Sequence, residues 1–218
     1  YIFVSGCSVN PVTGKQDFVM ISENQEIAMG KRYHAQILQQ IPPYPDEELQ
    51  AYVQEIGDSL SAKSHRPNLF YRFTVLDSPD INAFALPGGY IYINRGLMAY
   101  LSSEEELAAV LGHEIGHVTA RHSVRQYSQS QILGILSTAI EMNQGRSAGN
   151  LANLASGALL SGYGREMELE ADDLGAQYIF QEGYSPQGMF DVLSVLKDQE
   201  IYSKALAKKR GQEPRSYH

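Results

Sequence analysis

Two histidines four residues apart, with a glutamate beside the first, form the segment His113-Glu114-Ile115-Gly116-His117. The apolar residues around it predict a helix, in which residues four apart lie on one face, one turn above each other. Imidazoles in this relation can hold one zinc ion, and Glu114 is placed to take a proton from zinc-bound water. The pattern arises by chance in roughly one chain in a hundred of this length. The motif therefore indicates a metal site only if a helix surrounds it and the chain supplies a third ligand.

The third ligand is expected in an acidic segment about fifty residues further along. Its carboxylates are those of Glu166, Glu168, Glu170, Asp172 and Asp173. Helical periodicity places Glu168 and Asp172 on the apolar, buried side and the other acids on the solvent stripe. Buried carboxylates are destabilising unless they are paired or bound to metal. We therefore expect Glu168 as the third ligand and Asp172 as the acceptor for a ligand imidazole N–H. The alternative is a structural salt bridge of these two acids with Arg165 or Arg121.

The other histidines are predicted to have ordinary roles. If the motif helix lasts to about Gln126, His122 lies about 140° around the helix from His117. It could then not join the same metal, and a packing or capping role is expected. His34 and His65 have no partner pattern in the sequence.

The elements that must position these residues are mostly helical, with a β-rich segment between them. Ser22 with Gln25 predicts a capping box, and Ser102 and Ser103 with Glu105 and Glu106 predict the start of the motif helix. Strands are expected at 71–76, 82–86 and 90–93. The remaining helices are expected at 22–41, 45–62, 128–141, 149–161, 165–182 and 186–198.

Composition narrows the class of protein. The 218 residues carry a net charge of −8, with 43% hydrophobic and 19% charged residues, which fits one folded domain. The acidic balance argues against nucleic acid as a partner, because phosphate binding needs clustered Lys and Arg. No run approaches about 18 apolar residues, so no membrane span is expected. The single cysteine excludes an internal disulfide.

That cysteine, Cys7, follows the small residues Ser5 and Gly6 and an apolar run. The pattern is typical of the end of a bacterial lipoprotein signal, in which cleavage leaves the cysteine to be lipidated. The alternative is a buried free thiol. We expect residues 1–6 to be signal sequence, 7–21 a tether with an exposed turn at 10–14, and 22–218 a single catalytic domain.

The metal motif and the later run Arg165-x-x-Glu168-x-x-Ala171-Asp172 together resemble the zinc metallopeptidases of the HtpX and CAAX-prenyl-protease group. The segments Asn82–Tyr90 and Asn10–Gly14 are most similar to its soluble, periplasmic BepA-like branch. This resemblance implies His113, His117 and Glu168 as ligands of one Zn²⁺, with Glu114 as the catalytic base. It also implies an α+β, mostly α, gluzincin-type fold with a small sheet beside the active-site helix.

Further roles are expected around this centre. The substrate is predicted to lie extended along Asn82, Ala83, Phe84 and Ala85 and to pair with them as an added edge strand. The alternative is an ordinary core strand with a Pro-Gly-Gly turn. Tyr163 or Arg165 is a candidate oxyanion donor because each lies close to the third ligand in sequence. The resemblance also makes His218 a candidate inhibitory ligand.

Together these features predict a zinc endopeptidase of the bacterial periplasm, lipid-anchored, with the outer membrane as the expected site. The resemblance implies misfolded or stalled envelope proteins as substrates and the outer-membrane assembly machinery as a partner. A latent peptidase fold acting as a chaperone or assembly factor is the competing class. Zinc-dependent hydrolysis of a non-peptide amide is a third. Glu114 favours catalysis, because zinc binding alone would not need a general base.

Overall fold

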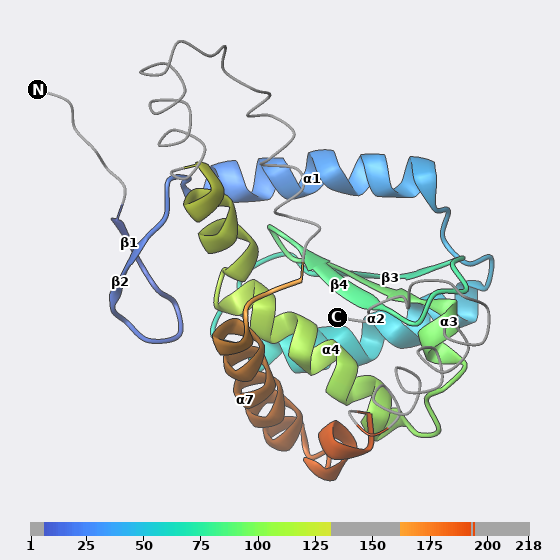
Figure 1. Cartoon of the computed structure of the whole chain (residues 1–218). Helices are drawn as coiled ribbons and strands as arrows, with labels where there is room; N and C mark the ends of the chain where they lie inside the picture. The colour runs from blue at the N-terminus through green and yellow to red at the C-terminus, as the bar shows by residue number, and fades with distance from the viewer. Residues whose placement is uncertain (1–6, 132–161, 193, 195–218) are drawn as a thin grey trace, which may run out of the picture.

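The structure, a computed structural model, describes residues 7–131, 162–192 and 194 (Figure 1). Its helices are α1 (Glu23–Gln40), α2 (Glu47–Ala62), α3 (Arg95–Met98), α4 (Glu104–Thr119) and α7 (Arg165–Glu182). Its strands are β1 (Cys7–Val9), β2 (Gln16–Phe18), β3 (Arg72–Leu76), β4 (Ala83–Leu86) and β5 (Tyr90–Asn94). The fold is thus α+β and mostly α, as the sequence predicts. The expected helices at 128–141 and 149–161, and the end of the one at 186–198, fall mainly outside the described residues.

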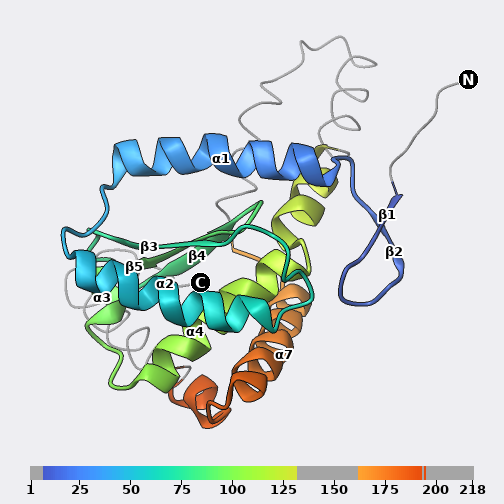
Figure 2. The ribbon, with the colours of Figure 1, turned by 180° about the vertical axis from the view of Figure 1, so that it is seen from behind.

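A small mixed sheet lies at the centre of the domain. Its strand order is β3-β5-β4, with β3 parallel and β4 antiparallel to β5, so β4 is an edge strand. Helix α1 crosses one face of the sheet, while α2 and α4 lie on the other (Figures 1 and 2). Helix α7 packs along α4. The turn from β4 to β5 uses Gly88 and Gly89 at φ of 78° and 91°, a region that favours glycine.

Two apolar clusters hold these layers together. The larger one joins α2, the sheet, α4 and α7, and includes the fully buried Leu60, Ile91, Leu111 and Tyr178. The smaller one packs side chains of α1 against the opposite face of the sheet around Tyr92. The motif helix is therefore anchored on both sides, by the sheet and by α7. None of the described helices combines the length and apolar character that crossing a membrane requires.

The predicted helix starts are confirmed. Ser22 and Gln25 form the expected capping box at the start of α1, with both reciprocal hydrogen bonds present. Ser103 caps α4 by accepting a hydrogen bond from the Glu106 amide. Asp46 caps α2 in the same way through the Leu49 amide. These side chains satisfy amides that a helix leaves unpaired at its start.

The predicted continuous helix to Gln126 is wrong. Helix α4 ends at Thr119, and the chain becomes helical again over residues 122–131. Between them Arg121 takes a left-handed conformation, with φ of 56°. Its buried guanidinium donates from Nε to Glu26 Oε2 at 2.9 Å, which holds the turn in place. This break changes the direction in which every later side chain points.

The N-terminal tether contains regular structure that the sequence did not predict. Strands β1 and β2 pair antiparallel, with Cys7 opposite Phe18. The expected turn at residues 10–14 joins them, and Asn10 Oδ1 accepts hydrogen bonds from the amides of Val12 and Thr13. Asn10 also donates to Asp17 at 2.6 Å. The hairpin projects from one side of the domain (Figures 1 and 2).

Candidate metal centre

Helices α4 and α7 approach each other through glycine. A Cβ added to Gly116 would lie 2.7 Å from the Ala171 carbonyl oxygen, and one added to Gly175 would lie 2.8 Å from the His113 amide nitrogen. At Gly112 it would meet an Ile179 methyl at 3.0 Å. Backbone therefore packs directly on backbone. Only this close approach lets side chains of moderate length from both helices meet at one point.

Three potential ligand atoms meet between these helices. Nε2 of His113 and Nε2 of His117 lie 2.9 Å apart. Glu168 of α7 places its carboxylate oxygens 3.5 Å from His113 Nε2 and 3.9 Å from His117 Nε2. Ligands of a tetrahedral zinc ion, with bonds of about 2.0 to 2.1 Å, would be about 3.3 Å apart. The three side chains thus fit a single small cation, with all ligand atoms within 4.8 Å of one another.

The second ring nitrogen of His113, Nδ1, lies next to Asp172, the residue expected to accept a hydrogen bond from a ligand imidazole. His113 Nδ1 and Asp172 Oδ1 are 2.8 Å apart. Burial opposes protonation of His113, but the hydrogen bonds to Asp172 and Glu168 and the charge of Glu114 outweigh it and raise the pKa to about 10. A cation bound at Nε2 would take the place of the proton there. Asp172 would still fix the ring with Nε2 directed at the ion.

The remaining nitrogen of His117 meets a residue that the sequence did not assign to the site. His122 Nδ1 lies 2.8 Å from His117 Nδ1, and His122 Nε2 lies 3.0 Å from Glu170 Oε2. Burial, with the neighbouring His113 and His122, holds the pKa of His117 well below its ordinary value. Burial likewise lowers the pKa of His122. Both shifts favour the neutral form of the rings, and the contacts of His122 show that it does more than pack or cap.

The periodicity argument sorted the acids of α7 imperfectly. Glu170, expected on the solvent stripe, is 26% exposed, while Glu168 and Asp172, expected to be buried, are 40% and 32% exposed. Glu170 is drawn inward by its hydrogen bonds to His122 and to Arg125. Glu168 and Asp172 both pair with His113, while Arg121, one of the salt-bridge partners that the alternative named, pairs with Glu26.

Glu114 lies inside the same crossing and is only 7% exposed. Burial raises its pKa to about 7, although the positive charge of His113 works in the opposite direction. A carboxyl group in this range can both accept and return a proton near neutral pH. A bound cation would lower its pKa and favour the base form.

Tyr163 covers one side of the centre. Its ring stacks on the ring of His117, with centroids 4.1 Å apart, and its hydroxyl lies 2.6 Å from Ser123 Oγ. A role as oxyanion donor would require that hydroxyl to leave Ser123. Arg165 is exposed at the first residue of α7. His218 lies outside the described residues, and the side chain of Cys7 is not described.

Strand β4, expected to bind substrate, packs against α4, and no other strand of the described residues pairs with its outer edge. The Asn94 amide donates to the Asn82 carbonyl at 3.0 Å. Because hydrogen-bonded pairs alternate along antiparallel strands, the backbone groups of Ala83 and Ala85 point away from β5. Phe84, between them, pairs with Tyr92 of β5, and the two side-chain rings stack with centroids 4.8 Å apart. Within the described residues, the outer edge of β4 thus presents backbone groups that β5 does not use.

The sequence profile of peptidase family M48 matches residues 47–214. This chain belongs to peptidase family M48. It is similar to the beta-barrel assembly-enhancing proteases of Yersinia pestis, with 34% identity over 204 residues, and Escherichia coli K12, with 30% over 213. These alignments cover 88% and 92% of the chain but 42% and 43% of the relatives, so it spans under half their length. A mitochondrial metalloendopeptidase OMA1 of Arabidopsis thaliana is 31% identical over 143 residues, covering 65% of this chain and 29% of that protein.

Membership of family M48 confirms the predicted family and identifies the chain as a metallopeptidase of gluzincin type. The crossing of α4 and α7 agrees with this assignment, because its donor set is two imidazoles and one carboxylate. Each imidazole also has an outer hydrogen-bond partner, as metal-binding histidines usually do. The residues of this chain therefore fit a metal of the family.

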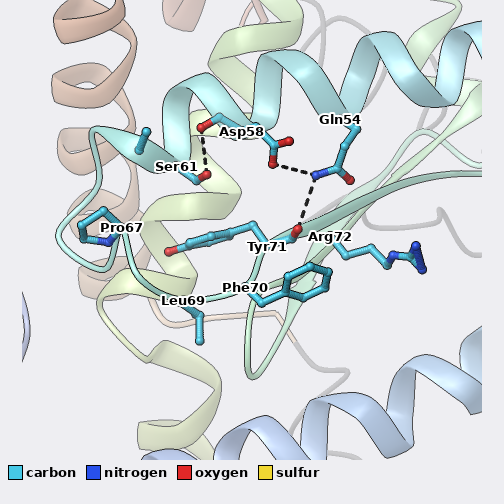
Figure 3. A pocket seen from close by; sticks show the side chains of 9 residues that line it. Gln54, Asp58, Ser61, Pro67, Leu69, Phe70, Tyr71 and Arg72 are labelled. Atoms are coloured by element: carbon cyan, nitrogen blue, oxygen red, sulfur yellow. Dashed lines mark hydrogen bonds between the residues drawn. The ribbon is translucent and has the colours of Figure 1, made fainter.

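A separate hollow of about 410 Å³ lies between α2 and the start of β3 (Figure 3). None of the residues lining it belongs to the metal centre. Its polar groups Gln54 and Asp58 hydrogen-bond to each other at 2.7 Å, and Gln54 also donates to the Tyr71 carbonyl. Phe70, at 70% exposed, forms part of its rim. This hollow and the candidate metal centre are therefore separate features of the described structure.

Proposed function

We propose that this chain is a zinc-dependent endopeptidase that cleaves misfolded or stalled proteins of the bacterial cell envelope. The observation that carries the proposal is the meeting of His113, His117 and Glu168 beside the buried Glu114. The names of the relatives, a beta-barrel assembly-enhancing protease among them, support the envelope as the setting.

Zinc is the metal that this donor set favours. Two imidazole nitrogens and one carboxylate are the ligands of catalytic zinc sites that keep a position open for water. When bound, zinc supplies Lewis acidity, which polarises a peptide carbonyl and lowers the pKa of water from 15.7 to about 7.

Glu114 is the residue of this chain that moves protons in the proposed reaction. Its carboxylate accepts a proton from the attacking water and returns it to the departing amine nitrogen of the peptide. Its 7% exposure keeps bulk water from competing for that proton. Tyr163 and Arg165 remain the candidates for a donor to the oxyanion, Arg165 being the one whose side chain is open to solvent.

The substrate is proposed to add to the sheet along Asn82, Ala83, Phe84 and Ala85. Backbone pairing with the outward groups of Ala83 and Ala85 would hold any extended segment, whatever its side chains. This suits unfolded envelope proteins, which expose extended segments that a folded protein would bury. Since α4 packs against β4, such a segment would lie next to the metal centre.

The envelope setting is proposed to depend on Cys7. Lipidation there would tether the domain to the membrane, with the outer membrane and its assembly machinery as the expected surroundings. Strands β1 and β2 would form the link between anchor and catalytic domain, which we take to begin at residue 22. Labelling with radioactive palmitate in a bacterial host should mark the full-length protein, and Cys7→Ser should remove the label. A label that survives the substitution would disprove the anchor.

The catalytic proposal is tested with Glu114→Gln. This variant should bind zinc as the wild type does, because Glu114 is not among the three ligand residues. It should lose casein cleavage, since an amide cannot act as the base. Cleavage retained at the wild-type rate would disprove the assignment of the base. A zinc-loaded wild-type protein that cleaves nothing but suppresses aggregation would instead indicate the chaperone class.

A further inference from the structure

The two histidines of the metal motif are supported in different ways. His113 meets the carboxylate of Asp172 directly. His117 meets a second imidazole, that of His122, which in turn meets the carboxylate of Glu170. Both His117 and His122 are buried, at 3% and 0% exposed, so water does not replace these hydrogen bonds. The support of His117 therefore contains one residue more than that of His113, because an imidazole lies between the ligand and the carboxylate.

The hydrogen positions in this series follow from the chemistry of its last member. An ionised carboxylate only accepts hydrogen bonds, so His122 Nε2 must carry the hydrogen that faces Glu170. In a neutral imidazole the other nitrogen is then bare, and His122 Nδ1 accepts from His117 Nδ1–H. This leaves the lone pair of His117 on Nε2, the atom that faces His113 and Glu168.

We propose that His122 is a positioning residue that, with Glu170, fixes His117 in the tautomer and ring orientation required for metal binding. The inference rests on the proposed zinc site and adds two residues to it. Arg125 completes the series by donating to the same Glu170 oxygen that His122 contacts, at 3.0 Å, which keeps that carboxylate ionised and in place. The ring of Tyr163 packs over both imidazoles and restricts their rotation.

The break after α4 is what makes this contact geometrically available. On a continuous helix, residues five apart point about 140° away from each other. The left-handed Arg121 redirects the chain, and the rings of His117 and His122 come within 5.0 Å, centroid to centroid. A non-glycine residue in this conformation is uncommon and persists only where its surroundings impose it. Glu26 supplies that constraint through its ion pair with Arg121.

The inference is tested by zinc affinity, measured by competition with a chromophoric chelator on the full chain. His122→Phe should weaken zinc binding by about 10- to 100-fold, the loss expected when an outer-shell partner of a ligand is removed. His122→Asn should recover much of that loss, because its side-chain oxygen can accept from His117 Nδ1–H. Glu166→Gln, which alters an exposed acid of α7, the helix that carries Glu168 and Glu170, should leave the affinity unchanged.

A direct measurement on the zinc-loaded wild type covers the case in which His122→Phe does not fold. A ¹⁵N–¹⁵N coupling across the hydrogen bond should join His117 Nδ1 to His122 Nδ1, with the proton on His117. The inference is overturned if that coupling is absent, or if folded His122→Phe binds zinc within twofold of the wild type. Failure of the proposed function would look different, since the wild type itself would then bind no zinc or cleave no protein.

Discussion

The close approach of α4 and α7 makes Gly116→Ala a sharp perturbation of the metal centre. The new Cβ would lie 2.7 Å from the Ala171 carbonyl oxygen and 3.0 Å from its Cα, whereas ordinary contact begins at 3.4 Å. Both opposing atoms are backbone, so the helices must separate by about 0.7 Å, because no side chain can rotate away. Ala171 lies between Glu168 and Asp172, so this displacement is transmitted to both acids.

The displacement is large on the scale of metal coordination. Functional metal sites hold their ligand distances to within about 0.2 Å. We therefore expect zinc affinity to fall on the order of tenfold or more, as when an outer-shell partner is lost. The effect on stability should be smaller. Overpacking destabilises by about 1 to 3 kcal/mol, and replacing glycine by alanine within a helix returns about 1 kcal/mol.

The assay separates these two effects. Urea unfolding in excess chelator reports the stability of the metal-free protein, and competition with a chromophoric chelator reports zinc affinity. Gly164→Ala is the matched control, because no atom of the described residues lies within 4 Å of its added Cβ and its φ of −71° suits alanine. If Gly116→Ala bound zinc as tightly as Gly164→Ala, backbone packing would not set the ligand geometry, and the reasoning would be refuted.

Three further outcomes follow from the described contacts. Glu168→Ala should lower zinc stoichiometry in elemental analysis, and the exposed Asp173→Ala should not; equal behaviour would remove Glu168 from the ligand set. Glu26→Gln should lower the free energy of unfolding in urea by about 3 to 5 kcal/mol, because two buried guanidinium groups lose the buried carboxylate that they share. Glu23→Gln, which removes only the 63% exposed partner of Arg66, should cost below about 1 kcal/mol; similar losses would contradict the buried network. Ala83→Pro, at the first residue of β4, should keep the fold but raise KM for extended peptides roughly 2- to 12-fold through one lost hydrogen bond. An unchanged KM relative to Ala83→Ser would argue against pairing along β4.

The three candidate ligand residues that the sequence predicts do meet in the structure, because their spacing within each helix is local. Histidines four apart on a helix face must lie together, and Glu168 with Asp172 repeats that spacing on the second helix. Helix starts at Ser22 and Ser103 were predictable for the same reason, since a cap is decided within four residues. The general form of the fold also follows from such local patterns.

What the sequence missed depends on contacts between distant residues. The break at Arg121 results from an ion pair with Glu26, 95 positions earlier, which no periodicity can reveal. The contact of His122 with His117 follows from that break, so a continuous-helix argument placed His122 away from His117. Glu170 was placed in solvent by the periodicity of its own helix, which could not show that His122 and Arg125 would reach it. The strands of the N-terminal hairpin were missed as well, because each has only three residues.

The buried Glu26 also bears on the order in which the molecule can assemble. It accepts hydrogen bonds from Arg66, 40 residues later, and from Arg121, and Arg66 in turn donates to the Val118 carbonyl at the end of α4. Contacts between residues so far apart in sequence form late, because closing the long loop costs entropy before the contact can stabilise the chain. Helix α4 can thus form early by local contacts, while the turn that brings His122 to His117 waits for α1 to dock. A chain still emerging from synthesis would carry the motif without the finished support for its ligand. Backbone amides near Arg121 should accordingly exchange hydrogen only when α1 unfolds, and faster local exchange there would contradict this order.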